Sequence, residues 1–485
     1  MDGMVLLQDI GALVAHLIVL ITGLAILTLD LFLPPQNRYV HEVCGVVGLI
    51  LALVLAALQS GEPRLVFQAM AVVDNLAVFF HVTFILIALI TILMSASYIR
   101  REAISPGEYY ALILFATTGF MFVASAANLV TLFLAIETLS IATYILAGIQ
   151  TQEQRSQEAA FKYFILGAFS SAIFLYGIAA IYGSQGHTNI MELAQALGQG
   201  DTPPMLMVGM GLLIVGLGFK VAVVPFHMWV PDVYDGAPTA VTGFMTAGPK
   251  AAAFAAFIRV FFQGFATPAL AQHWIPIFAV IAGLTMILGN LVAITQVSIK
   301  RMLAYSSIAH AGYAFVAMVT LDRLGAAGML YYLLAYALMS LGAFTVLTIV
   351  ARQGERHYAF SDYAGLSSTN PWLAALMALF MFALAGLPPT AGFASKFYVF
   401  SAAVQKGYYS LALIGVLTSV VSVAYYARVV MLMYMRDPNG DSPTAPVSAT
   451  SGTILGLTAF GTLALGIFPG SVWRLAERSV YLLFS

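Results

Sequence analysis

Three lysines lie inside long apolar stretches of the sequence, where a charged side chain is costly. They are Lys220 in "LGFKVAVVPF", Lys250 in "FMTAGPKAAAFAAF" and Lys396 in "GLPPTAGFASKF". An ammonium group at the centre of a bilayer costs about 3 kcal/mol on insertion scales. A lysine near a helix end can instead extend to the headgroups, an alternative that fits Lys250 least because it lies in the middle of its run. Since burial favours the neutral amine and a nearby carboxylate favours the ammonium, a buried lysine can take up and release a proton.

One carboxylate could work with these lysines. Glu137, in "TLFLAIETLSIATYIL", lies deep within an apolar run. It either forms a hydrogen bond to a neighbouring helix or serves as the counter-ion of Lys220. Lys162, in "AAFKYFIL", lies at the start of a run, and its position alone favours extension to the headgroups.

Two histidines are further candidates for moving protons. His227 follows Pro225 in "PFHMWVPDVYDGAPT", a loop rich in turn residues. This loop either only shapes the return into the next span or opens the site to the cytoplasm through His227. His310, in "SSIAHAGYAF", is either a satisfied packing group or a relay that titrates near neutral pH, with Tyr305, Ser306 and Ser307 able to hold water beside it.

The composition places these residues in a membrane protein. Of 485 residues, 61% are hydrophobic and 8% are charged, whereas soluble domains carry about 25% charged residues. The net charge of −1 gives no indication of a nucleic-acid partner. One cysteine excludes a disulfide framework and a chain-borne iron–sulfur cluster, which needs about four thiolates. There is no metal or nucleotide motif, and Gly209, Gly211, Gly216 and Gly218 are expected to pack helices.

Apolar runs of about 20 residues predict an all-α polytopic protein with about fourteen spans. The first ten residues include Asp2 and Asp9 and no basic residue, so we expect the first run to be a permanent span and not a signal peptide. The predicted spans are 10–33, 42–60, 75–97, 109–126, 128–149, 160–183, 205–225, 239–262, 274–295, 302–320, 325–350, 372–404, 409–433 and 450–469.

The loops between these spans differ in positive charge, which predicts orientation. One alternate set should be cytoplasmic and holds Arg38, Arg100, Arg101, Arg155, Lys162, Lys300, Arg301, Arg352, Arg356 and Arg436. The other set holds Arg64, Arg323, Lys406, Arg474 and Arg478, with Arg259 nearby. Both termini are then predicted to lie outside.

The chain also divides into two halves that resemble each other in reverse. In the first half Lys220 precedes Pro225, and in the second half Pro388 and Pro389 precede Lys396. Interrupted apolar segments at corresponding places predict inverted repeats with a site near the membrane midplane. We therefore predict two inverted five-helix repeats, each with a broken helix. The predicted units are 1–108 (helices 1–3), 109–262 (helices 4–8), 263–435 (helices 9–13) and 436–485 (helix 14).

Three stretches carry a resemblance to a known family. They are "GFKVAVVPFHMWVPDVYDGAPTAVTGFMTAGPK", "SIKRMLAYSSIAHAGY" and "GLPPTAGFASKF". They resemble the antiporter-like subunits of respiratory complex I, which are related to Mrp-type cation/proton antiporter subunits. The "PDVYDGAPT" form, the lysine at position 396 and the short segment after residue 470 resemble the N subunit more closely than the L or M subunits. The resemblance covers roughly residues 10–470.

The resemblance implies a role for each candidate residue. Glu137 and Lys220 would be the input-side ion pair, Lys250 the central relay and Lys396 the outlet-side lysine. Lys162 matches a lysine that the family places between the pair and the centre. His227 matches the histidine of the "PFH" loop, and His310 matches a relay region less tightly.

The implied function is proton translocation within NADH:quinone oxidoreductase. FMN, the iron–sulfur clusters and quinone would lie in partner subunits, and this chain would hold no cofactor and no metal. Its partners would be other membrane-arm subunits and the lipid of a bacterial plasma (inner) membrane. The alternatives are a cation/proton antiporter, alone or as an Mrp-like subunit, and a structural membrane anchor.

Overall fold

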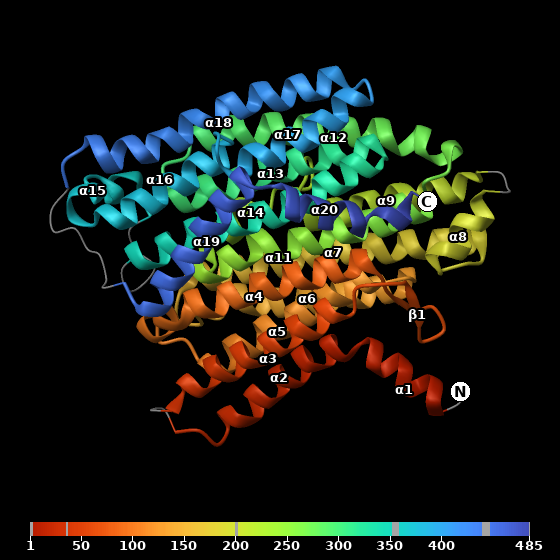
Figure 1. Cartoon of the computed structure of the whole chain (residues 1–485), viewed down its shortest axis with the longest axis horizontal. Helices are drawn as coiled ribbons and strands as arrows, with labels where there is room; N and C mark the ends of the chain where they lie inside the picture. Colours follow the sequence, from red (N-terminus) through yellow and green to blue (C-terminus); the bar gives the residue numbers. More distant parts are fainter. Residues whose placement is uncertain (1–2, 35–36, 199–201, 352–357, 439–446, 485) are drawn as a thin grey trace.

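The structure is a computed structural model that describes residues 3–34, 37–198, 202–351, 358–438 and 447–484. Arg352 and Arg356 lie outside the described residues. The N-terminal part is helical apart from one short hairpin (Figure 1). Its elements are α1 (Gly3–Ala12), α2 (Val14–Asp30), α3 (Tyr39–Leu58), β1 (Arg64–Val66), β2 (Ala71–Val73) and α4 (Asn75–Arg101). The two strands pair antiparallel, with Leu65 opposite Val72.

The rest of the described chain is helical. The first half continues with α5 (Pro106–Ser125), α6 (Leu129–Ala147), α7 (Gln154–Gln185), α8 (Ile190–Leu197), α9 (Pro204–Val221), α10 (Val230–Gly236), α11 (Thr239–Phe257) and a π-helical turn η2 (Ile258–Gly264). The second half holds α12 (Pro268–Ile294), α13 (Ile299–Thr320), α14 (Arg323–Val350), η3 (Phe360–Tyr363), α15 (Leu366–Thr369), α16 (Pro371–Ala385), α17 (Ala391–Gln405) and α18 (Tyr409–Met435). The last elements are α19 (Ala449–Ile467), α20 (Gly470–Ser479) and η4 (Tyr481–Leu483).

Capping side chains define where several spans begin. Asp74 accepts a hydrogen bond from the backbone N–H of Ala77 at the start of α4 (2.8 Å). Asn128 caps α6 through the N–H of Val130 (2.8 Å), and Asp322 caps α14 in the same way. A side-chain oxygen at this position satisfies one of the backbone donors that a helix start leaves free, so the spans begin at sharply defined residues.

The predicted spans are largely present as helices. In the described ranges, twelve helices are long and apolar enough to cross a membrane, or thirteen if α1 and α2, bent by 70°, form one span. The predicted segment 372–404 consists of two short helices, α16 and α17, as its interruption by prolines and glycines indicated. The count of fourteen, the inverted repeats and the unit boundaries therefore remain predictions.

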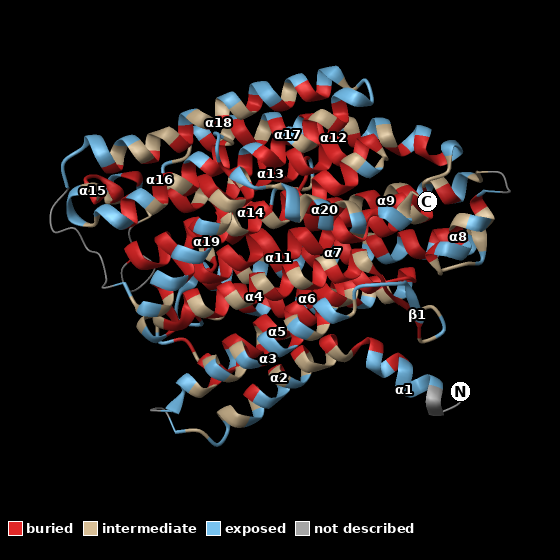
Figure 2. Cartoon of the chain, viewed as in Figure 1, coloured by how far each residue is buried: buried red, intermediate tan, exposed pale blue. Residues whose placement is uncertain are grey.

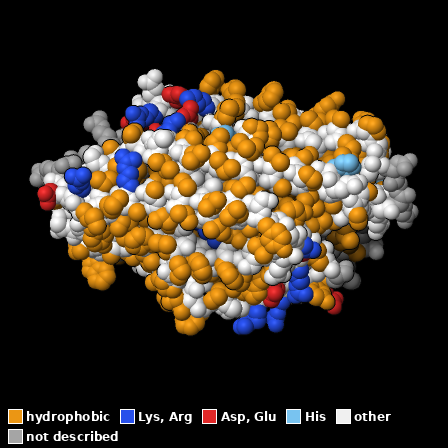
Figure 3. All heavy atoms as spheres, turned by 90° about the horizontal axis from the view of Figure 1, so that it is seen from above, with side chains coloured by type: hydrophobic (Ala, Val, Ile, Leu, Met, Phe, Trp, Pro, Cys, Tyr) orange, Lys and Arg blue, Asp and Glu red, His pale blue; other side chains and the backbone are white. Residues whose placement is uncertain are grey.

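The most buried helices form the centre of the molecule (Figure 2). Every residue in the apolar window of α11 and η2 is buried, and α13 and α14 are nearly as enclosed. The peripheral helices α3 and α18 bury only a third of their windows. Figure 3 shows a face covered mostly by hydrophobic side chains, as expected where lipid or partner subunits contact the protein.

Glycines bring two helices of the first half close together. A Cβ atom at Gly209 would lie 2.7 Å from Ile181, and one at Gly216 would lie 2.6 Å from Phe174, both on α7. The predicted packing role is confirmed for these two glycines. Gly211 has open space instead, and Gly218 faces Phe226 of the loop after α9.

Candidate functional site

Lys220 lies one residue before the end of α9, and its side chain reaches α6. Its ammonium group donates hydrogen bonds to Ser140 Oγ (2.8 Å) and Tyr144 Oη (3.2 Å). The lysine is only 8% exposed, so it is a buried residue and does not extend to the membrane surface. It also lies 5.6 Å from the centre of the Tyr144 ring, within the range of a cation–π contact.

Glu137 lies on the same face of α6 as the two groups that hold Lys220. Positions 137, 140 and 144 are three and four residues apart, a spacing that places them on one side of a helix. The Glu137 carboxylate accepts a hydrogen bond from Ser171 Oγ of α7 (2.5 Å). Within the described ranges, Glu137 and Lys220 form no direct ion pair within 4.0 Å. The two groups lie near each other, with Ser140 between them along α6, and their role as an input-side ion pair stays a prediction.

The backbone that leaves α9 finds partners elsewhere. The residue after the helix, Ala222, has a φ of +66°, and the N–H of Val224 donates to Thr285 Oγ1 (2.9 Å). Trp229 Nε1–H donates to the carbonyl of Phe219 (3.1 Å). Since non-helical backbone at membrane depth needs polar partners, these contacts stabilise the break that follows Lys220.

Lys250 lies at the centre of the molecule, on a helix whose residues are all buried. Its ammonium donates to the carbonyl oxygen of Ser307 (2.5 Å) and to the Ser307 hydroxyl (2.8 Å). The preceding residue, Pro249, has no N–H to donate to the carbonyl of Met245. The Tyr234 hydroxyl donates to that carbonyl instead (2.9 Å), so the helix tolerates a proline beside the lysine.

His310 follows Ser307 by one turn of α13 and lies among tyrosines. Its Nδ1 atom shares a hydrogen bond with Tyr332 Oη (2.6 Å), and its Nε2 atom with Tyr426 Oη (3.3 Å). Ser306 also hydrogen-bonds to Tyr426. Of the residues expected beside His310, Ser306 joins this cluster and Ser307 holds Lys250.

Lys396 lies at the second helix break. It donates to the carbonyl oxygens of Ala385 (2.9 Å) and Leu384 (3.4 Å), which end α16 and have no intrahelical partner. Its Nζ also lies 4.6 Å from the centre of the Tyr313 ring. The Tyr313 hydroxyl accepts from Asn290 Nδ2, and Asn290 Oδ1 accepts from the Tyr425 hydroxyl, each at 2.9 Å. Polar contacts thus follow α13 from Ser307, which holds Lys250, to Tyr313, whose ring lies near Lys396.

Lys162 is placed apart from this buried row. Its ammonium contacts Glu158 (2.7 Å) and Asp232 of α10 (2.9 Å), and 38% of its side chain is exposed. Arg301 of α13 also contacts Asp232 (2.9 Å). Burial alone raises the pKa of Asp232, but the hydrogen bonds from Lys162 and Arg301 outweigh it and lower that pKa below its ordinary value. The charges line a polar cavity of ≈ 250 Å³ that includes Arg155.

His227 lies in the loop between α9 and α10 and is partly buried. Its Nδ1 atom has no hydrogen-bond partner among the described residues. The structure therefore places most of the predicted residues in three groups: Glu137 with Lys220, Lys250 with His310 and Lys396, and Lys162 apart. His227 lies outside these groups, in the loop between α9 and α10. The described side chains do not join all the lysines by one continuous hydrogen-bonded chain.

Sequence reasoning missed most of the neutral partners. Tyr144 and Ser140 lie at helical spacing from Glu137, so a search along that face would have found them. Ser171, Tyr332 and Tyr426 come from helices far away in the sequence and carry no such signal. This arrangement can hold three buried ammonium groups through hydrogen bonds to uncharged oxygen atoms. Each ammonium group can release a proton from such a setting.

The chain belongs to the antiporter-like class of membrane proteins, and the family model that shows this spans both helix breaks and their buried lysines. A family model described as "NADH:quinone oxidoreductase/Mrp antiporter, TM" matches residues 126–422. "NADH-quinone oxidoreductase subunit N" of Trichlorobacter lovleyi is 43% identical over 477 residues, which are 98% of each chain. The chain belongs to the subunit N family of NADH-quinone oxidoreductases, and it is a multi-pass membrane subunit of such an enzyme complex.

Solved structures agree with this assignment. A chain of respiratory complex I from Thermus thermophilus with bound aureothin is 35% identical, with a TM-score of 0.82, and the match covers 96% of this chain and 99% of that chain. A chain of the Mrp complex from Dietzia sp. has a TM-score of 0.84 over 99% and 98% of the two chains at 20% identity. The second likeness is one of fold alone.

Proposed function

We propose that this chain translocates protons within NADH:quinone oxidoreductase, through a relay of Glu137, Lys220, Lys250, His310 and Lys396. The observation that carries the proposal is that three lysines are buried, each bound to uncharged oxygen atoms. A buried ammonium with a close carboxylate would be held firmly. With hydroxyl and carbonyl partners alone, its proton can be released when a neighbouring charge changes.

In this proposal the three groups have successive roles. Glu137 and Lys220 form the input side, where the carboxylate sets how firmly Lys220 holds its proton. Lys250 is the central relay, because it lies on the most enclosed helix and bonds to α13. His310 and its tyrosines connect the centre to Lys396, the outlet-side lysine.

Lys162 and His227 have proposed roles on the entrance side. Lys162 lies in a charged, partly exposed cavity, which fits a group that collects protons or positions α10 better than a buried link. His227 would open the Lys220 site to the cytoplasm. Both termini lie at the same end of the molecule (Figure 1), and we propose that this end faces outside a bacterial plasma membrane.

The redox chemistry would take place in partner subunits. The single cysteine, Cys44, is too few for an iron–sulfur cluster, and it lies on α3 away from the lysines. This chain would carry out no redox step, and its enzymatic role would be that of a translocase subunit. FMN, iron–sulfur clusters and quinone would be bound by the partners. The antiporter alternative rests on the family model that both classes share and on a likeness of fold.

Replacing Lys220 or Glu137 with alanine tests the proposal. NADH-driven acidification of membrane vesicles should fall by about tenfold or more, because a positioned proton carrier is lost. The control is Lys406→Ala, which removes a half-exposed lysine whose charged partner within the described ranges is Asp322 at 3.8 Å. Chain levels are compared by immunoblot. Near-normal acidification at wild-type levels of the Lys220→Ala chain would refute the relay.

A further inference from the structure

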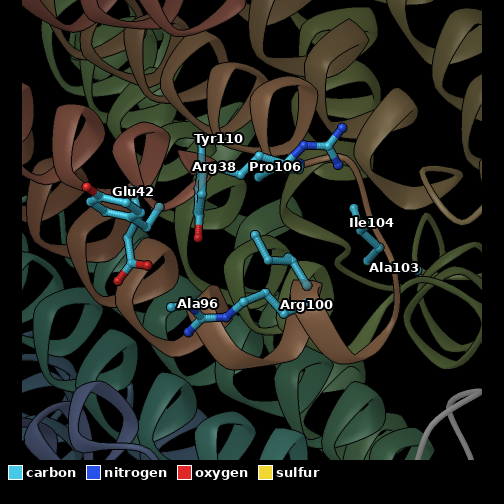
Figure 4. A pocket seen from close by; sticks show the side chains of 10 residues that line it. Arg38, Glu42, Ala96, Arg100, Ala103, Ile104, Pro106 and Tyr110 are labelled. Carbon is cyan, nitrogen blue, oxygen red and sulfur yellow. The ribbon is translucent and has the colours of Figure 1, made fainter. Parts of the chain in front are cut away.

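A cavity of ≈ 370 Å³ lies between α3, α4 and α5, and no residue of the proposed lysine relay lines it. Its polar lining comes from Arg38, Tyr39, Glu42, Arg100 and Tyr110. Figure 4 shows the Tyr110 hydroxyl, the Glu42 carboxylate and the Arg100 guanidinium bordering one space, with Arg38 beyond Tyr110. The proposed proton relay uses none of these residues.

The charged groups of this cavity form no ion pair with described residues, although Arg100 lies near enough to attract the Glu42 carboxylate. Within the described ranges, neither guanidinium nor the Glu42 carboxylate has an oppositely charged group within 4.0 Å. Arg101, next in the chain, differs because it is paired with Glu102 at 2.9 Å. Arg100 and Glu42 thus present one positive and one negative charge to the same space (Figure 4).

The cavity lies at the level where the spans begin and end. α3 starts at Tyr39, α4 ends at Arg101, and α5 starts at Pro106. Helix ends of this kind mark the boundary between hydrocarbon and headgroups, where tyrosines are enriched. A ligand in this cavity would therefore lie at headgroup depth.

An apolar stripe leads from the cavity along α3. Its side chains are between 50% and 59% exposed and lie on one face of the helix: Tyr39, Val43, Val47, Ile50 and Val54. Tyr39 belongs to both the stripe and the cavity lining. An acyl chain could follow this stripe from a headgroup held in the cavity.

We propose that the cavity binds a zwitterionic phospholipid with a primary amine, of the phosphatidylethanolamine type. Arg100 holds the phosphate, and Glu42 and the Tyr110 hydroxyl accept hydrogen bonds from the ammonium. Free inorganic phosphate fits less well, because Glu42 would repel it and nothing would cover the stripe. A purely anionic headgroup would leave the Glu42 carboxylate without a partner.

Photo-cross-linking of the intact complex tests this site. The complex is reconstituted in nanodiscs of equal parts phosphatidylethanolamine, phosphatidylglycerol and phosphatidylcholine, with a trace of phosphatidylethanolamine carrying a diazirine on an acyl chain. Adducts are mapped by peptide mass spectrometry. We expect adducts within residues 39–54, reduced about fivefold in Arg100→Gln because one cationic contact is lost. The matched control is Arg436→Gln, an exposed arginine at the end of α18.

Competition by added lipids and by phosphate shows which headgroup the cavity recognises. Extra phosphatidylethanolamine should reduce the adduct more than extra phosphatidylglycerol does, and millimolar inorganic phosphate should leave it unchanged. Glu42→Gln should reverse the preference toward phosphatidylglycerol. Misfolding would not produce such a reversal. This variant therefore still tests the proposed site if the complex with Arg100→Gln fails to assemble. Equal adducts in wild type and Arg100→Gln, equal competition by the two lipids, or displacement by inorganic phosphate would overturn the proposal.

Discussion

The three buried lysines differ from surface lysines in what holds them. Lys220 is held by two hydroxyl groups, Lys250 by a hydroxyl and a carbonyl, and Lys396 by the carbonyls at a helix end. Hydrogen bonds to a charged group contribute about 1.5–3 kcal/mol each. Removing such a partner should therefore alter how a lysine carries its proton without removing the lysine.

Ser140→Ala applies this reasoning to Lys220. The ammonium loses its shorter hydrogen bond (2.8 Å), and proton pumping should fall by roughly tenfold given the energy of such a bond. Thr138→Ala is the matched control, because Thr138 carries an exposed hydroxyl on the same helix that donates to the backbone carbonyl of Leu134. Equal pumping by the two variants would mean that Ser140 does not hold the lysine during turnover.

Gly386→Ala tests the position of Lys396. Gly386 has a φ of +88°, and an added Cβ would lie 2.9 Å from Lys396 Cδ and 3.2 Å from Nζ. Gly407→Ala is a close control, since its φ is +81° with open space around it, so both variants carry similar backbone strain of about 1–2 kcal/mol. Pumping by vesicles should fall for Gly386→Ala alone. A similar loss in both variants would point to strain and not to the lysine.

The charged relay residues could be found from the sequence because lysine and glutamate stand out in apolar runs. Their partners could not, because a serine or tyrosine in a transmembrane helix is ordinary until the fold brings it near a charge. For Lys162, its position in the sequence alone does not decide its role. The sequence left it between a headgroup contact and a relay role, and the structure places it in an ion cluster with Asp232.

At the scale of helices, a buried arginine joins distant parts of the chain. Arg259 of η2 is 1% exposed and donates to both carboxylate oxygens of Asp74 at 2.7 Å. Asp74 also caps α4, so the pair fixes η2 against the start of that span. The loop charges predict that Arg259 lies near an outer loop. Its partner is 185 residues away, which no local pattern reveals.

Arg259→Met should destabilise the chain, because removing one partner of a buried ion pair costs about 3–5 kcal/mol. The double variant Arg259→Met/Asp74→Asn should recover part of the loss, since asparagine is uncharged and can still cap α4. The midpoint of thermal inactivation of the purified complex provides the measurement. A single variant as stable as wild type would show that the pair is dispensable.

Helix breaks were the element-scale feature most accessible from sequence. Prolines and glycines in apolar runs predicted interruptions near Lys220 and Lys396, and α9–α10 and α16–α17 have them. The short helices α8 and α10 and the π-helical turn η2 were not predicted. In α10 and η2, Asp232 and Arg259 form ion pairs with residues far away in the sequence, which a local pattern does not show.

For the whole molecule, the lysine-bearing helices α9 and α11 lie among the inner spans, and α17 packs against α13 and α14 beside the peripheral α18. Helices α2, α3 and α18 form the periphery (Figures 1 and 2). Apolar composition predicted a polytopic membrane protein, and hydropathy predicted most spans. Which spans become central could not be read from hydropathy, because a lipid-facing helix and a buried one are equally apolar. The arrangement keeps the relay enclosed and leaves outer faces for lipid and partner subunits.

The most direct test of the account is the number of protons moved per NADH oxidised by a complex that carries Lys250→Met. Methionine resembles lysine in shape but cannot carry a proton, and Lys250 lies on the most enclosed helix. We predict that the ratio falls below that of wild type and of Lys406→Met, while electron transfer from NADH to an artificial soluble acceptor stays the same. An unchanged ratio, with the complex fully assembled, would contradict a relay through the buried lysines.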